Sequence, residues 1–234
     1  MKRNPSGLVG GLSRIPPGAE TLDGFRRWSR GASFPERGRI DFLDGDLEVD
    51  LSPEDIYTHG AVKTALAAAL YGRVALTGRG GVYVDCTRLV SVSASLSVEP
   101  DVLVVLWEAL AAGRVREVPA AGNKEGRFIE LEGAADLVVE VISDSSERKD
   151  RQRLPPLYAR SGVPELWLAD VRGRDARLAI LQLRTDRPAV SAIGYAQAPA
   201  DAGGWSASRL LGCRCRLRRQ TIDGVRCVYE LELA

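Results

Sequence analysis

The stretch from Asp136 to Asp170 constrains the fold of this chain more than any other. It opens with an apolar run, Leu137 to Ile142, that is interrupted only by Glu140, and it closes with a second apolar run, Glu165 to Ala169. Continuous apolar runs rich in β-branched residues are typical of strands buried on both faces. The intervening residues predict a short helix that ends at Ser161-Gly162. The stretch therefore predicts a strand, a helix and a strand, which is about the size of a βαβ unit.

Glu140 is the residue in this stretch that most requires an explanation. An ionised carboxylate inside a buried strand costs several kcal/mol unless a positive group meets it. A second acid, Asp101, stands at the start of another apolar run, Val102 to Leu106, directly after Pro100. If the two strands are neighbours, the two carboxylates lie close together, and like charges at short range raise a pKa or recruit a cation. Glu140 and Asp101 therefore form a candidate site.

Oxygen ligands on a rigid pair of strands suit Mg²⁺ or Mn²⁺. Such an ion polarises a phosphodiester and lowers the pKa of a bound water. The order of proline and aspartate, apolar strand, and glutamate in a further apolar strand thus indicates phosphodiester hydrolysis. Spacing alone leaves a second interpretation open, in which the two acids only end or cap their strands.

The segments before this site predict a helix, a hairpin and a second helix. Thr21 to Ser29 is expected to form a short helix, and Arg39 to Asp50 a hairpin that turns at Asp44-Gly45. Asp41 in that hairpin lies either on the surface or toward a cleft. The second helix is expected to start at an N-cap at Ser52 and to stop at Gly72. His59 shares the apolar side of this helix, where it is either a packed residue or a ligand.

The remaining elements are read from alternation and turn residues. Ser91 to Glu99 is expected to be a polar connector, Trp107 to Gly113 a helical turn, and Arg116 to Leu131 a hairpin with its tip at Ala121-Gly122-Asn123. Further strands are predicted at Gly81 to Val90, Arg177 to Leu183, Ala189 to Ala196, Arg214 to Arg219 and Val225 to Leu233.

Length, composition and net charge limit the classes of protein to which this chain can belong. With 234 residues, of which 45% are hydrophobic, the chain fits a single domain over residues 20–234, preceded by a flexible arm over residues 1–19. The net charge of +1 does not by itself indicate binding to nucleic acid, so a nucleic-acid partner would need a local basic face. No apolar stretch reaches the roughly 18 residues of a membrane helix, which predicts no membrane partner and a cytoplasmic location.

The four cysteines do not form a zinc motif, because no CxxC pair is present. As part of a strand, Cys213 and Cys215 would point inward as small apolar groups.

Several blocks together resemble the Uma-two family of restriction-endonuclease-like proteins, which belongs to the PD-(D/E)XK nuclease superfamily. The resemblance extends over roughly residues 20 to 220. The blocks that carry it are Pro100-Asp101 with Val102 to Val105, Asp136 to Ser143, Asp150-Arg151, Tyr158-Ala159 and Gly162 to Asp170, with Ile40 to Leu47, Ser52-Pro53 and His59 upstream and Leu210 to Gly212 downstream.

The resemblance implies an α/β (α+β) fold with a restriction-endonuclease-like mixed sheet flanked by helices, to which this chain adds C-terminal strands. It implies Asp101 and Glu140 as metal ligands, with the backbone carbonyl of Val141 as a third, and Mg²⁺ or Mn²⁺ as the ion. Asp41, where the family usually has glutamate, is an outer acid, and His59 positions a ligand or a phosphate. DNA is the implied partner, and a homodimer is a further expectation.

One residue departs from the pattern. The family takes its catalytic lysine from the helix after the second acidic strand, four residues past the aspartate at Asp150, and that position is Leu154. An arginine could steady negative charge there but cannot act as a base, whereas a glutamine could hold a water. Weakened hydrolysis is therefore expected, and the alternative is a catalytically inactive nuclease-fold module that binds nucleic acid or a protein partner. The nearby substitutes are Lys149, Arg151, Gln152 and Arg153.

Overall fold

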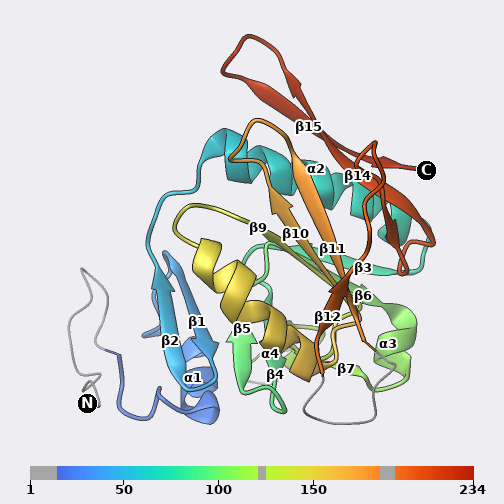
Figure 1. The fold of residues 1–234 in the computed structure, drawn as a ribbon. Helices are drawn as coiled ribbons and strands as arrows, with labels where there is room; N and C mark the ends of the chain where they lie inside the picture. Colours follow the sequence, from blue (N-terminus) through green and yellow to red (C-terminus); the bar gives the residue numbers. More distant parts are fainter. Residues whose placement is uncertain (1–14, 121–124, 185–192) are drawn as a thin grey trace.

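Three β-sheets with helices packed against them make up the part of the chain that this computed structural model describes, residues 15–120, 125–184 and 193–234 (Figure 1). The central sheet has the order β12-β11-β10-β9-β6-β3. Its only parallel pair among these strands is β9 with β10, and the other neighbours run antiparallel. The strands are β3 (Gly80–Val84), β6 (Val102–Leu106), β9 (Leu137–Val141), β10 (Glu165–Asp170), β11 (Arg177–Leu183) and β12 (Tyr195–Gln197).

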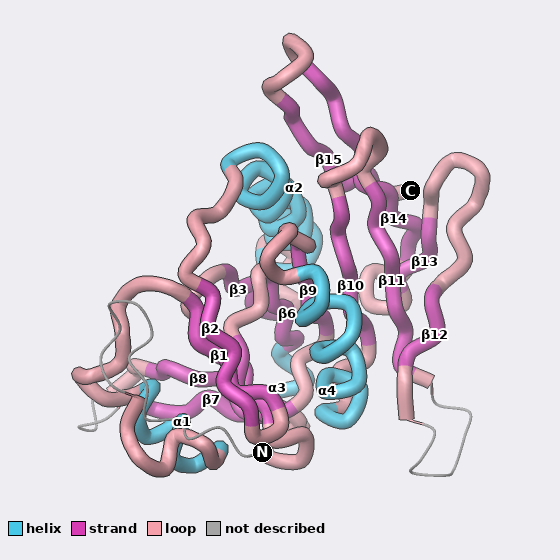
Figure 2. Tube along the Cα trace, turned by 60° about the vertical axis from the view of Figure 1, so that its left-hand side comes forward, coloured by secondary structure: helices cyan, strands magenta, loops and turns pink. Residues whose placement is uncertain are grey.

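An N-terminal sheet and a small C-terminal sheet accompany the central one. The N-terminal sheet has the order β2-β1-β5-β4-β8-β7, and the C-terminal sheet has the order β13-β14-β15. The N-terminal sheet comprises β1 (Arg39–Leu43), β2 (Asp46–Asp50), β4 (Arg88–Ser91), β5 (Leu96–Val98), β7 (Val115–Pro119) and β8 (Phe128–Gly133). The C-terminal sheet comprises β13 (Ser206–Ser208), β14 (Cys213–Thr221) and β15 (Cys227–Leu233), and Figure 2 shows it beside α2.

The helices are short, and three of the helical segments are π-helical turns. They are α1 (Leu22–Ser29), η1 (Ile56–Gly60), α2 (Ala61–Leu70), η2 (Tyr71–Ala75), α3 (Trp107–Ala111), η3 (Lys149–Arg153) and α4 (Leu154–Ser161). None of the helices in the described residues is both long and apolar enough to cross a bilayer.

The two faces of the central sheet are covered by different elements. On one face, α2 contributes Val62, Leu66 and Leu70 to a core shared with the C-terminal sheet. On the other face, Leu157 and Tyr158 of α4 join a second core, which the N-terminal sheet completes. Since side chains alternate along β6 and β9, successive residues of these strands enter different cores. The central sheet is therefore buried on both sides, as its continuous apolar runs predict.

The predicted unit over residues 136–170 is confirmed. Strands β9 and β10 pair in parallel, with Leu137 opposite Glu165 and Val141 opposite Ala169. The helix between them ends at Gly162, whose φ of 84° is the left-handed conformation that glycine adopts without strain. The mixed sheet flanked by helices and the additional C-terminal strands are likewise as expected.

The N-terminal helix and the hairpin are also confirmed. Thr21 caps α1, which buries Phe25 and Trp28. Asp44 and Gly45 both have positive φ angles, 54° and 94°, as the tight turn between β1 and β2 requires.

The prediction of one strand over Gly81 to Val90 was wrong. The chain reverses at Asp85 and Cys86, which both have positive φ angles, so that β3 joins the central sheet and β4 joins the N-terminal sheet. The prediction of a polar connector over Ser91 to Glu99 was also wrong, because β5 lies within it and is buried. Alternation within one segment does not reveal that its two halves pair with different partners.

The bounds of the second helix also differ from the prediction. Asp55, rather than Ser52, caps it by accepting hydrogen bonds from the backbone of Tyr57 and Thr58. The helical segment continues through Gly72 to Ala75, because Val74 is fully buried in the core. Burying a valine is worth roughly 1.5–3 kcal/mol, which exceeds the cost of about 1 kcal/mol for glycine in a helix.

Other predictions fall partly outside the described residues. The hairpin of β7 and β8 is confirmed, but its predicted tip at 121–123 lies outside them, as do residues 1–14 of the predicted arm and residues 189–192 of one predicted strand. Ala19, at the end of the arm, is buried with Phe25 and Phe42. One short strand, β13 (Ser206–Ser208), was not predicted from the sequence. Cys213 and Cys215 pack against the core, as predicted.

Candidate metal-binding site

The pairing of β6 with β9 brings Asp101 and Glu140 together. The two strands are antiparallel neighbours with Val102 opposite Val139, so Asp101 and Glu140 follow at adjacent positions. The backbone N–H of Val141 donates a hydrogen bond of 2.7 Å to Asp101 Oδ2. Both acids face α4 and the N-terminal sheet. The expectation that these two strands are neighbours is confirmed.

The side chains of Arg39 and His59 contact the carboxylate of Asp101. Arg39 Nη2 lies 2.8 Å from Asp101 Oδ1, and His59 Nε2 lies 3.4 Å from Asp101 Oδ2. The residue is 1% exposed, and burial by itself would raise the pKa of Asp101. The contact with His59 and the charge of Arg39 outweigh burial and hold the pKa of Asp101 well below its usual range. Asp101 is therefore ionised at neutral pH.

The pKa of Glu140 is shifted in the opposite direction from that of Asp101. Burial, reinforced by the charges of Asp101 and Asp150 against the opposing charge of Lys149, raises the pKa of Glu140 to about 8. Its Oε1 accepts a hydrogen bond of 2.6 Å from the hydroxyl of Tyr158. Its Oε2 is buried and has no hydrogen-bond partner among the described residues. A buried polar atom without a partner costs roughly 1–3 kcal/mol, so this oxygen fits a divalent ion as its missing partner.

Lys149 brings a buried positive charge near Glu140, although the direct contacts of its ammonium are with Asp41 and Asp150. It lies on η3 and is 5% exposed, with its Nζ 3.5 Å from Asp41 Oδ2 and 3.4 Å from Asp150 Oδ1. Burial alone would lower the pKa of Lys149, but Asp41, Glu140 and Asp150 together raise it above its ordinary value. The ammonium is therefore charged and held among the acids.

Asp41 is a buried residue rather than a surface residue. Its exposed fraction is 1%, and its Oδ1 accepts a hydrogen bond from the backbone N–H of Glu99. Arg39 lies two residues earlier in β1, so the two side chains leave the strand on the same face. Strand β1 of the N-terminal sheet thus closes the site from the side opposite β6 and β9.

The other candidate site residues of the charged segment lie away from Asp101 and Glu140. Arg151 pairs with Asp170 and Glu147, and Arg153 pairs with Asp46 and Glu48 of β2. Gln152 is exposed, and Leu154 is fully buried in the core beneath α4. Of the nearby substitutes for the missing lysine, the structure brings only Lys149 to the acids.

The π-helical turn explains this placement. The backbone N–H of Leu154 bonds to the carbonyl of Lys149, so the two residues are one π-helical turn apart. The position where the family pattern places a lysine is filled by a core leucine, and the ammonium comes from the preceding turn. The sequence showed a charged segment but did not show which of its members are buried.

Three site residues were missed in the sequence. Arg39 was read only as the start of a hairpin, although its spacing from Asp41 indicates a shared face. Asp150 served as part of a resemblance block and as the point from which to count, yet it is buried beside Lys149, with a hydrogen bond from Ser146. Glu54, at the N-terminal side of η1, was read as part of a helix start, and its Oε2 lies 3.3 Å from His59 Nδ1.

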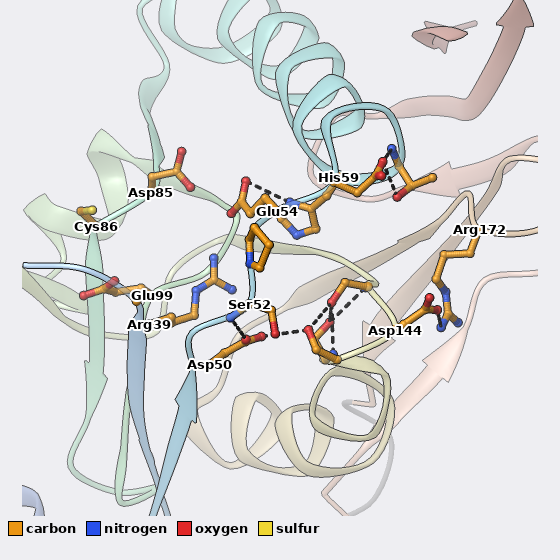
Figure 3. A pocket seen from close by; sticks show the side chains of 17 residues that line it. Arg39, Asp50, Ser52, Glu54, His59, Asp85, Cys86, Glu99, Asp144 and Arg172 are labelled. Carbon is orange, nitrogen blue, oxygen red and sulfur yellow. Dashed lines mark hydrogen bonds and ion pairs between the residues drawn. The ribbon is translucent and has the colours of Figure 1, made fainter. Parts of the chain in front are cut away.

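A pocket of about 780 Å³ lies next to this site (Figure 3). Arg39 and His59 line it, but Asp101 and Glu140 do not, so the side chains of Arg39 and His59, which both contact Asp101, lie between that acid and the pocket. The lining is predominantly acidic, with Arg172 as a further cation. The acids that line it are Asp50, Glu54, Asp55, Asp85, Glu99 and Asp144.

The central mixed sheet flanked by helices is the arrangement expected of a restriction-endonuclease-like fold. The family model Uma2, described as "Putative restriction endonuclease", matches residues 22–209. Because the match spans most of the sequence, the chain belongs to the Uma2 family.

A solved structure supports the fold. It is described as a "putative nuclease belonging to DUF820" from Anabaena variabilis, and it matches with a TM-score of 0.57 and 14% identity over 82% of this chain and 90% of that chain. At this identity the likeness shows the fold alone. No curated protein matches the chain.

Proposed function

We propose that this protein is a metal-dependent endonuclease that hydrolyses DNA phosphodiester bonds. The observation that carries the proposal is the buried set of Asp101, Glu140 and Lys149, together with the partnerless Glu140 Oε2. Family membership supports a nucleic-acid substrate.

The residues of the site would have different roles in this reaction. Asp101, Glu140 and the carbonyl of Val141 would hold Mg²⁺ or Mn²⁺. When bound, the ion supplies polarisation of the phosphodiester and a water of lowered pKa. Lys149 steadies negative charge on the phosphate, and Asp41 and Asp150 fix the position of its ammonium. Arg39 already lines the pocket, where its guanidinium can contact a phosphate once it is released from Asp101.

The presence of Lys149 changes the expectation of weakened hydrolysis. A lysine is available to the acids from a different turn of the helical segment, so the leucine at position 154 does not remove the positive charge from the site. The position of Lys149 therefore supports an active enzyme over one that has lost its catalytic activity.

Nicking of supercoiled plasmid in Mg²⁺ or Mn²⁺ tests the proposal. Asp101→Asn, Glu140→Gln and Lys149→Met should each lower the rate by roughly 10²–10³-fold, since each removes a group that touches the ion or the phosphate. Gln152→Ala, a change at an exposed neighbour on the same segment, should leave the rate unchanged. Equal activity in all four folded variants would remove Asp101, Glu140 and Lys149 from the mechanism.

A second candidate is a nuclease-fold module that binds nucleic acid or a protein without cleaving. Two observations favour it: Arg39 and His59 already contact the carboxylate of Asp101, and the acidic lining of the pocket repels a phosphate backbone, which favours a protein partner over a nucleic acid at this pocket. It predicts no cleavage in any divalent metal, and any DNA binding away from this pocket should depend on salt.

Arg39→Gln distinguishes the two candidates. Removing the guanidinium frees Asp101 Oδ1, so an enzyme should bind Mn²⁺ more tightly, as measured by calorimetry. A variant at an exposed arginine in an ion pair, Arg160→Gln, is the matched control. A non-catalytic module should show neither tighter Mn²⁺ binding nor cleavage in Arg39→Gln. Leu154→Lys is unsuitable for this purpose, because it would place an ammonium in the core.

A homodimer and a cytoplasmic location remain part of the proposal as predictions from the sequence. Light scattering on the purified chain tests the first, and fractionation of cells that express it tests the second.

A further inference from the structure

Strand β3 is an unpaired edge of the central sheet, and Figure 2 shows it at one end of that sheet, with β12 at the other. Next to its antiparallel pairing with β6, the backbone carbonyl of Arg79 accepts a hydrogen bond from the N–H of Trp107, so the odd-numbered residues direct their backbone groups at β6. Gly80, Val82 and Val84 therefore direct theirs away from the sheet. No described residue outside the sheet donates to or accepts from the backbone of Val82.

The other sheet edges of the described strands carry features that oppose pairing with a second chain. Strands β12 and β13 are only three residues long. The three longer edges carry charged side chains or a proline, which are Asp46, Glu48 and Asp50 in β2, Arg116, Glu117 and Pro119 in β7, and Glu230 and Glu232 in β15. Strand β3 has neither a charge nor a proline. It is therefore the edge that is open to a further strand.

Strand β3 is complementary to itself in one register. If two copies pair about a two-fold axis at Val82, Gly80 of each copy lies opposite Val84 of the other, and all the outward-facing residues form hydrogen-bonded pairs. Any other register leaves some of these residues unpaired. Gly80 and Gly81 have no side chains, which leaves room for Val84 and Tyr83 of the other copy. Val84 is 42% exposed in the single chain, and the pairing would cover it.

The same register brings opposite charges together just beyond the ends of the strand. Arg79 of each copy then lies opposite Asp85 of the other. Arg79 is exposed and forms no ion pair within the described residues, and its Nη2 donates to the carbonyl of Leu210 at 3.1 Å. The side chain of Asp85 is 51% exposed, beside Lys63. Register and charge together therefore fit a second copy of this chain.

We propose that β3 pairs with β3 of a second copy of this chain, so that the two central sheets form one continuous sheet. Asp85 lines the acidic pocket, so the pairing adds the partner subunit's Arg79 to the rim of each pocket. A further cation there makes the acidic lining less repulsive to a phosphate. The pairing assigns a surface to the homodimer, and it rests on the proposed function only for the role of the pocket.

The experiment measures the mass of the full chain by sedimentation equilibrium over a range of concentrations, without DNA. The unaltered chain should form a dimer. Val82→Pro should abolish it, because proline removes the central outward N–H while the hydrogen bonds to β6 remain. Leu233→Pro is the matched control, since the bonds between Ala234 and Arg214 show that the N–H of Leu233 also faces away from its sheet. This control should remain a dimer, and circular dichroism confirms that both variants fold.

A second test does not depend on whether Val82→Pro folds. Arg79→Glu and Asp85→Arg each place like charges opposite one another in a homodimer, and each should weaken dimerisation by roughly tenfold. An equimolar mixture of these two variants should regain dimers, because both ends of the pair then join opposite charges. Damage to the fold of either variant would not be repaired by mixing.

A monomer at every concentration would overturn the proposal. So would a dimer that folded Val82→Pro leaves intact, because the interface would then lie elsewhere, and so would a mixture of the charge variants that regains no dimer. Since mass is measured without substrate, a dimer that never nicks DNA refutes only the nuclease proposal. A monomer that nicks DNA refutes only the pairing of β3.

Discussion

At the scale of single residues, the acid pair shows how two neighbouring strands of one sheet give two carboxylates opposite protonation behaviour. Asp101 contacts Arg39 and His59 and stays ionised, whereas Glu140 is fully enclosed beside Tyr158, and its burial, with the negative charges of Asp101 and Asp150, raises its pKa to about 8. Two like charges this close are not both stable without a cation, so the pair titrates as a unit. A metal ion that binds here must displace the proton from Glu140.

The raised pKa of Glu140 predicts a stability that depends on pH. The folded chain holds this proton up to a pH of about 8, while the unfolded chain releases it near 4.5. Between these values the folded state binds more protons, so the contribution of Glu140 to stability falls as the pH rises. Glu140→Gln cannot ionise, and its advantage in unfolding free energy should grow from pH 5 to pH 8 by on the order of 3–4 kcal/mol.

Urea denaturation of both proteins at several pH values measures this difference. Glu132→Gln is an informative control, because Arg116 and Arg26 lower the pKa of Glu132 against the effect of burial. The stability that Glu132 contributes is present above its unfolded pKa of about 4.5 and is lost only as the pH falls below that value, so the difference between Glu132→Gln and the unaltered chain should stay nearly constant from pH 5 to pH 8. A constant difference between Glu140→Gln and the unaltered chain across the range would mean that Glu140 is not held protonated.

At the scale of elements, the helical segments carry local signals that core packing overrides. Gly72 looks like a helix stop, yet the segment continues past it so that Val74 can reach the core. In the same way η3 puts Lys149 among the acids and Leu154 in the core, one π-helical turn apart. The function of a charged segment is then decided by which of its residues packing turns inward.

Gly72 gives a prediction at this scale. It is exposed in a helical segment, and a Cβ added there would meet no atom within 4 Å. Gly72→Ala should therefore stabilise the chain by about 0.5–1 kcal/mol, which is a rise of a few degrees in Tm. Gly162→Ala is the contrasting variant, because Gly162 has a φ of 84° and should be destabilised by the same change. Calorimetric melting of both variants checks the signs, and a lower Tm for Gly72→Ala would contradict the argument.

At the scale of the whole molecule, Glu165 connects the C-terminal sheet to the central one. It is buried at the start of β10, and its carboxylate accepts hydrogen bonds from Trp167 Nε1, from the hydroxyl of Ser208 and from the backbone N–H of Arg209. Both oxygens are satisfied, and the donors come from two different sheets. Together with the shared core of α2 and β15, this contact favours one cooperative unit rather than separable parts.

We therefore expect residues 20–234 to unfold in a single transition, with far-ultraviolet circular dichroism and tryptophan fluorescence giving the same midpoint. Glu165→Ala should lower the unfolding free energy by about 2 kcal/mol or more, because it leaves two buried donors, Trp167 Nε1 and the hydroxyl of Ser208, without their acceptor. It should also speed hydrogen exchange in β13 and β14 more than in β1 and β2. Two separate transitions in the unaltered chain would show that the C-terminal sheet is an independent unit.

The sequence by itself determined the strands that carry the two acids, the helix between β9 and β10, and the need of Glu140 for a positive partner, because burial patterns and turn residues act locally. Only the tertiary structure decided which cations meet these acids. Lys149, rather than a residue at position 154, and Arg39, from a hairpin about a hundred residues away from Glu140, reach the site because sheets and a π-helical turn bring them there. Their burial results from packing between distant segments, and no local pattern of residue types encodes it.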